Sequence, residues 1–135
     1  MKIATKIGFT LTEIMVVVIA IAIMAAFAIP SYTKTVERAH LRDSITQLST
    51  IYAAHEIYKT QTGGYWPDGT VEGLASINSN LGLNILANGM VYTCEGDQFS
   101  FSCSAVRQPP APTFTLTLTD AVLSSSNPSC SGACP

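Results

Sequence analysis

The feature that most limits how this chain can fold is an apolar stretch near its N-terminus. Between Ile14 and Ile29 the sequence has no charged or strongly polar side chain. Residues 9–29 would form a helix roughly 31 Å long, which matches the hydrocarbon core of a bilayer at about 30 Å. Lys2 and Lys6 precede this stretch, and the positive end of such a segment stays in the cytoplasm. The sequence therefore predicts a membrane-spanning helix, with everything after Pro30 outside the inner membrane.

Three interpretations of this stretch are open from its composition. A cleaved secretory signal peptide is disfavoured because the apolar run is too long and the helical pattern continues past it. A plain single-pass anchor is the simplest alternative. The third interpretation gives a function to Glu13, because a carboxylate near the bilayer centre costs about 2.5–3.5 kcal/mol and somewhat less near its edge. We expect such a group to have a specific partner.

The overall composition excludes several classes of protein. Only 12% of the 135 residues are charged, 47% are hydrophobic, and the net charge is −2. A chain without a basic excess is not expected to bind nucleic acid as its main task. All four cysteines come after residue 90, which predicts an oxidising compartment for the C-terminal part.

The N-terminal motif resembles the signature of bacterial type IV pilins and pseudopilins. Five features coincide: a short basic leader, Gly8, Phe9, an acid four residues later at Glu13, and an unbroken apolar helix. The resemblance covers about 30 of the 135 residues. It implies that a prepilin peptidase cuts between Gly8 and Phe9 and methylates the new amine of Phe9. Residues 1–8 would be the leader, and residues 9–30 the transmembrane and filament-core helix.

Cleavage at this position would give Glu13 its partner. The new α-amine of Phe9 has an intrinsic pKa of about 7.7–8.0 and lies one helical turn from Glu13. A paired charge is tolerated in an apolar core where a lone charge is not. The resemblance implies that pairing with a neighbouring subunit guides docking into the fibre. The plainer alternative is that the Glu13 side chain extends to the membrane interface.

Beyond Pro30, where the family carries a helix-kinking proline, the sequence predicts one amphipathic helix to about residue 62. Proline removes a backbone donor and bends a helix. Apolar residues recur at spacings of three and four up to Tyr58, and Gly63 and Gly64 give a stop signal.

The globular part, residues 31–135, is expected to add an antiparallel meander to this helix. Residues 63–89 contain many turn-forming residues and predict an irregular connection in which Tyr65 and Trp66 cover the apolar face of the helix. Alternating patterns predict strands at 90–94, 99–107 and 113–120, within a meander spanning 90–123. The turn 95–97 and the proline-rich bend 108–112 separate these strands. The predicted fold class is therefore α+β, with a pilin-like arrangement.

The C-terminal tail, residues 124–135, has no core-forming pattern, so its cysteines are expected to fix it in place. Cys94, Cys103, Cys130 and Cys134 permit three disulfide connectivities, and the sequence does not choose between local and crossed pairs. A zinc site is the competing interpretation, but the spacing is not that of paired CxxC motifs.

The sequence contains no motif that indicates catalysis. It has no phosphate-binding glycine loop, nucleophile elbow or HExxH motif, so we expect neither an enzyme nor a cofactor or metal. His40 and His55 each lack a cysteine or carboxylate at metal-ligand spacing, and we expect solvated or partly packed side chains. Arg38 and Arg42 are expected to lie on a solvated face. Asp97 and Asp120 are too few for a calcium site.

The resemblance predicts a structural subunit of a type IV pilus for adhesion, twitching motility or DNA uptake. Its partners would be copies of itself, the prepilin peptidase and the inner-membrane assembly machinery, with the membrane as its location before export to the cell surface. The first alternative is a pseudopilin of a type II secretion system. The cysteine-bearing tail favours a pilin, since many pilins close a C-terminal loop by a disulfide. A different class, a monomeric membrane-anchored binding module, would keep residues 1–8.

Overall fold

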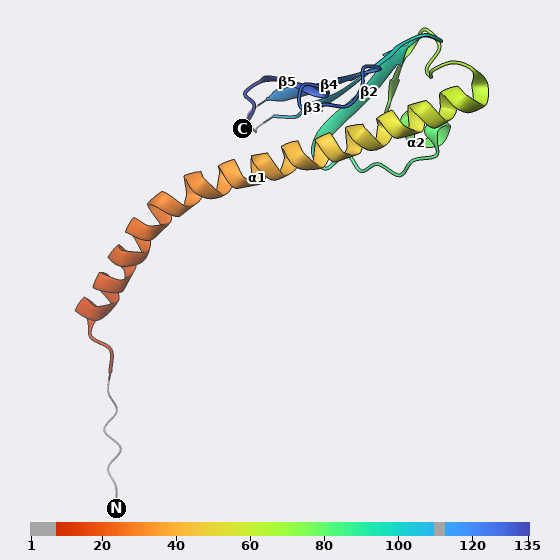
Figure 1. The fold of residues 1–135 in the computed structure, drawn as a ribbon. Helices are drawn as coiled ribbons and strands as arrows, with labels where there is room; N and C mark the ends of the chain where they lie inside the picture. The colour runs from red at the N-terminus through yellow and green to blue at the C-terminus, as the bar shows by residue number, and fades with distance from the viewer. Residues whose placement is uncertain (1–7, 110–112) are drawn as a thin grey trace, which may run out of the picture. The chain divides into compact units, whose positions relative to one another are not determined.

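The computed structural model describes residues 8–109 and 113–135, so most of the leader and part of the expected bend at 108–112 lie outside the described residues. It has an α+β fold in which a long helix precedes an antiparallel sheet (Figure 1). The elements in chain order are α1 (Leu11–Thr62), β1 (Val71–Gly73), α2 (Leu74–Leu81), β2 (Met90–Gly96), β3 (Phe101–Arg107), β4 (Phe114–Thr119) and β5 (Ser129–Gly132). The chain divides into two compact units, one up to Val36 and one from Glu37 onward, and α1 contributes to both.

The sheet has five strands in the order β1-β2-β3-β4-β5, and every neighbouring pair is antiparallel. The predicted alternation is confirmed in β2, β3 and β4, because every second side chain is buried. The opposite face carries mainly Ser and Thr, which can remain hydrated. The inward side chains of the three central strands are Met90, Tyr92, Cys94, Phe101, Cys103, Ala105, Phe114, Leu116 and Leu118.

The second unit has one hydrophobic core between this face and the C-terminal part of α1, which runs along the sheet in Figure 1. Leu48 and Ile51 of α1 are completely buried there, one helical turn apart. Tyr65 is buried and Trp66 packs against the same cluster, as predicted for the cover of the helix face. The apolar face of the amphipathic half of α1 is thus covered by the sheet, as its spacing of apolar residues predicts.

The prediction of an irregular connection over 63–89 was wrong, because β1 and α2 lie within it. The apolar residues of α2 are Leu74, Ile77 and Leu81, spaced three and four apart, and Ile77 is completely buried. Asn and Ser between them gave the segment the composition of a loop. Gly82 ends α2 in the left-handed conformation, with φ 65°, and donates its amide hydrogen to the carbonyl of Asn78.

The tail and the strand ends also differ from the prediction. Within the tail, β5 pairs with β4, so that Cys130 lies opposite Leu116. The strand predicted at 90–94 continues to Gly96, and the one predicted at 99–107 begins at Phe101. The turn therefore lies at 97–100 rather than 95–97. There the Asp97 carboxylate accepts hydrogen bonds from the amides of Phe99 and Ser100, at 2.7 and 2.8 Å.

Candidate functional site

The candidate site begins at the N-terminal end of α1, where Thr10 and Glu13 form a capping box. The Thr10 amide donates to Glu13 Oε2 at 2.9 Å, and the Thr10 hydroxyl donates to the same oxygen at 2.7 Å. The Glu13 amide in turn lies 3.3 Å from the Thr10 hydroxyl oxygen. Two backbone donors that the first turn of a helix leaves unpaired are satisfied in this way. Glu13 therefore caps the N-terminal end of α1 and also carries a negative charge.

The surface that follows the capping box is apolar and exposed. In the most apolar 18-residue window of α1 the mean hydropathy is 2.7, and none of that window is buried. Among the described residues, α1 is the one helix long and apolar enough to cross a membrane. The large exposed apolar side chains on this segment are Phe9, Leu11, Ile14, Met15, Val16, Val17, Val18, Ile19, Ile21, Ile23, Met24, Phe27 and Ile29. Such a continuous surface needs a cover of lipid or protein.

Phe9 and Glu13 lie close together at the start of this surface. They line a shallow hollow together with Thr12, Val16 and Val17. Phe9 is 82% exposed and directly precedes the capping box. A new amine at Phe9 would be next to the positive end of the helix dipole, where Glu13 is the acidic residue of the first turn.

Gly8 and Phe9, the residues of the predicted cleavage site, are both exposed. Among residues 8–109 and 113–135, no atom lies within 4 Å of a β-carbon built on Gly8, so packing against these residues does not require glycine there. The cleavage, the charge pair and the bend at Pro30 remain predictions. The backbone of α1 is helical on both sides of Pro30.

An ion pair fixes α1 to the sheet in the second unit. Arg107 donates from Nε to Glu37 Oε2 at 2.9 Å and from Nη2 to Oε1 at 3.0 Å. Its third nitrogen donates to the carbonyl of Gly89 at 2.9 Å. The guanidinium lowers the pKa of Glu37, and the carboxylate raises that of Arg107. Because the two forked groups match in shape, the pair fixes the position of β3 on the helix.

Both disulfides are local. Cys94 on β2 bonds to Cys103 directly opposite on β3, and Cys130 bonds to Cys134 in the tail. The structure thus selects one of the three connectivities that the sequence left open. The first bond lies in the core and the second on the surface.

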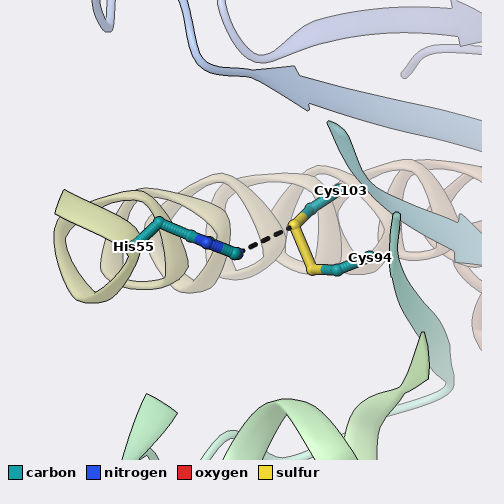
Figure 2. A group of neighbouring side chains, drawn as sticks. All are labelled: His55, Cys94 and Cys103. Carbon is teal, nitrogen blue, oxygen red and sulfur yellow. Dashed lines mark hydrogen bonds between the residues drawn. A yellow bond between two sulfur atoms is a disulfide. The ribbon is translucent and has the colours of Figure 1, made fainter. Parts of the chain in front are cut away.

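His55 lies against the buried disulfide, so the prediction of a solvated or partly packed side chain was wrong. Its Nε2 is 3.6 Å from Cys103 Sγ, as Figure 2 shows, and the side chain is completely buried. The ring stacks on Phe101 with centroids 4.0 Å apart and planes 10° apart. Burial lowers the pKa of His55 to about 4, so the imidazole is neutral at pH 7.

Two curated proteins are similar to this chain. The type II secretion system core protein G of Vibrio cholerae serotype O1 is 33% identical over 64 residues, which is 47% of this chain and 44% of that protein. The type IV major pilin protein PilA of Myxococcus xanthus is 38% identical over 58 residues, or 43% of this chain and 26% of that protein. Together with the long apolar helix and the antiparallel sheet, these similarities support a relationship to type IV pilins and pseudopilins.

The similarity to these family members is partial. The chain spans less than half the length of either relative. No protein-family model matches it, and no solved structure gives a significant match.

Three structural features of this chain were not predicted from the sequence. The Thr10-x-x-Glu13 spacing is the capping-box signature and could have been recognised. The pairing of Glu37 with Arg107 joins residues 70 positions apart, and nothing local indicates it. The contact of His55 with Cys103 spans 48 positions and depends on the packing of α1 against β3.

Proposed function

We propose that the chain is a structural subunit of a type IV pilus, which polymerises through residues 9–30 into a surface filament. The observation that carries this proposal is the unburied apolar surface of α1, on a chain whose second unit has a closed core of its own. The filament would serve adhesion, twitching motility or DNA uptake, and the subunit would have no catalytic role.

The energetics of this surface support a polymer. Burying a Val, Leu or Ile side chain is worth about 1.5–3 kcal/mol, and more than ten large apolar side chains of this segment are exposed. The inner membrane would cover them in the single-pass precursor. Neighbouring helices would cover them in the filament, where Ala20, Ala22 and Ala26 would allow close approach. When a subunit moves from the membrane into the filament, the apolar surface of α1 would therefore stay covered, first by lipid and then by neighbouring helices.

The proposed partners follow from the N-terminal segment. A prepilin peptidase would cut between Gly8 and Phe9 and methylate the new amine. Glu13 would then pair with the Phe9 amine of its own or a neighbouring subunit, while the inner-membrane assembly machinery extracts the subunit. The capping box supports this proposal because it holds the Glu13 carboxylate beside Phe9 at the open end of the helix.

A pseudopilin of a type II secretion system is the second candidate, supported by the similarity to the Vibrio cholerae protein. Both candidates use the same assembly interactions. The Cys130–Cys134 disulfide, which closes a loop at the C-terminus, supports the pilus subunit.

The cellular location of the assembled protein distinguishes a pilus subunit from a secretion pseudopilin. Cells are sheared, and the released filaments and the membrane and periplasmic fractions are probed for the chain. A pilus subunit is recovered in sheared surface filaments. Recovery in the membrane and periplasmic fractions alone, with normal processing at Gly8, would favour the pseudopilin.

A further inference from the structure

One group of potential metal ligands exists within residues 8–109 and 113–135. The donor atoms of His55, Cys94 and Cys103 lie within 4.8 Å of one another, and all three residues are buried. Figure 2 shows the imidazole directed at the disulfide, with a dashed line from the ring to Cys103. In the closed disulfide neither sulfur is a thiolate, which is the form of cysteine that binds a metal.

We propose that reduction of the Cys94–Cys103 disulfide converts this cluster into a three-ligand site for Zn²⁺. A dithiol or phosphine reductant supplies two electrons, the S–S bond breaks, and two protons complete two thiols while the reductant is oxidised. Zn²⁺ then displaces both thiol protons and forms two Zn–S bonds and one bond to Nε2 of His55. In the metal-bound form the single proton of the imidazole would be on Nδ1, because Nε2 binds the ion. Two thiolates and an imidazole form a ligand set that suits this ion.

One distance in the closed form, between Cys103 Sγ and His55 Nε2, is near the value that the ion requires. With about 2.3 Å to sulfur and 2.0–2.1 Å to nitrogen, a tetrahedral ion places these two ligand atoms about 3.5 Å apart. The observed separation of Cys103 Sγ and His55 Nε2 is 3.6 Å. The histidine therefore needs little movement to become a ligand.

The backbone keeps the two cysteines together after reduction. Cys94 and Cys103 are direct partners across β2 and β3, with Cα atoms 4.0 Å apart. The flanking pairs Thr93 with Ser104 and Glu95 with Ser102 maintain the register. The sulfurs must move apart to about 3.8 Å to bind one tetrahedral ion, which side-chain rotation can achieve.

Aromatic packing holds the imidazole in place. The ring stacks on Phe101, and the rings of Tyr65 and Trp66 lie with centroids 6.1 and 6.3 Å away. Within the described part of the chain, His55 Nδ1 has no hydrogen-bond partner, and Nε2 has only the weak contact with sulfur. The ring is thus oriented toward the sulfurs without strong hydrogen bonds that binding would have to break.

The second disulfide provides a matched control. Cys130 and Cys134 are exposed, and the structure places no histidine of its described residues in a group with them. Reduction of this bond therefore offers two thiols without a third ligand. The site can be assigned to the buried pair by comparing the two double serine variants.

The test uses the full chain in detergent micelles, reduced with a phosphine and titrated with Co²⁺ or Cd²⁺, followed by competition with Zn²⁺. We expect one metal ion per chain in the reduced protein and none in the oxidised protein. Charge-transfer absorption would report the thiolate ligands. The double variant Cys130→Ser/Cys134→Ser should bind as the wild type does, and Cys94→Ser/Cys103→Ser should not bind. His55→Gln should weaken binding by about 100-fold or more, since loss of an outer-shell partner alone costs 10–100-fold.

Thermal unfolding provides a second readout. Zn²⁺ should raise the unfolding temperature of the reduced wild type and leave that of the oxidised protein unchanged. The proposal is overturned if the reduced chain binds no metal ion, whether or not reduction has unfolded the protein. Binding that His55→Gln leaves unchanged, or that requires Cys130 and Cys134, overturns it as well. None of these results depends on whether the chain forms a filament.

Discussion

Thr10 donates two hydrogen bonds, from its amide and its hydroxyl, to a single carboxylate oxygen of Glu13. This relationship gives Glu13 two separable properties, a cap for α1 and a negative charge. Replacing Glu13 by alanine removes both, so that variant alone cannot show which property assembly needs. Glutamine at the same position can still complete a capping box, because its side-chain oxygen accepts the same bonds.

We therefore predict that Glu13→Gln is inserted and cut but forms few fibres. Loss of about 1.4 kcal/mol per subunit contact lowers an association constant tenfold, so the fibre yield should fall by at least that factor. The matched control is Thr10→Ala, which removes the cap at a cost of about 1 kcal/mol of helix stability and keeps the charge. The fibre yield is measured by shearing and quantifying fibres from cells that carry each variant. A normal fibre yield from Glu13→Gln would show that assembly does not need the negative charge of Glu13.

Gly8→Ala is predicted to leave an uncut precursor in the membrane. A methyl group at this position would have no neighbour within 4 Å in the described part of the chain, so the substitution should not disturb the packing of that part. Any loss of cleavage then reflects recognition by the peptidase. Immunoblotting of membrane fractions would show the longer precursor, and fibres of normal abundance would contradict the cleavage claim.

Glu37→Gln is predicted to destabilise the second unit by about 2 kcal/mol, between the 0–1 kcal/mol of an exposed ion pair and the 3–5 kcal/mol of breaking a buried one. The guanidinium lowers the pKa of Glu37 in the folded state. The stabilisation is therefore complete above the ordinary pKa of a glutamate, and it is lost as the pH falls through the lowered value. Urea unfolding at pH 7 and at acidic pH measures the effect.

The exposed neighbour Arg38 provides the control for this experiment. Arg38→Gln changes one charge on the same helix and leaves the pair of Glu37 with Arg107 intact. We expect a change within about 0.5 kcal/mol, as for most surface substitutions. Equal effects of the two variants would show that the pair does not stabilise the fold.

His55 predicts a second pH dependence. Its pKa is about 4 in the folded protein because of burial and about 6.5 when unfolded. The unfolded chain therefore binds more protons between these values, and stability declines as the pH falls from about 6.5 to about 4, by at most about 3 kcal/mol. His55→Phe should flatten this part of the profile. An unchanged profile in urea unfolding, with both disulfides intact, would show that His55 does not titrate on unfolding.

The predictable parts of the fold were those with a repeated local pattern. In β4, Phe114, Leu116 and Leu118 alternate with threonines, and the structure buries all three. The length and composition of the apolar stretch after Glu13 were enough to predict a long helix there. By contrast, β1 has three residues, too few to show a period, and it forms because Val71–Gly73 pairs with the edge of β2. Such strands are created by tertiary contacts rather than by local preference.

The candidate site shows the same division. Phe9 and Glu13 line one hollow, and their proximity follows from a spacing of four residues. The environment of His55 does not, because it depends on β3 bringing Phe101 and Cys103 to α1. A single histidine on a helix face gives no sign of a disulfide 48 positions away in the sequence. Contacts of this range need the packed structure.

We propose that the chain is cut after Gly8 and assembles through the apolar helix that begins beside Phe9. Intact-mass and N-terminal peptide measurements on purified filaments distinguish the cut chain from the uncut one. We expect filaments built from residues 9–135, with a methyl group on the Phe9 amine. Material that retains residues before Phe9, and that does not polymerise, would contradict it.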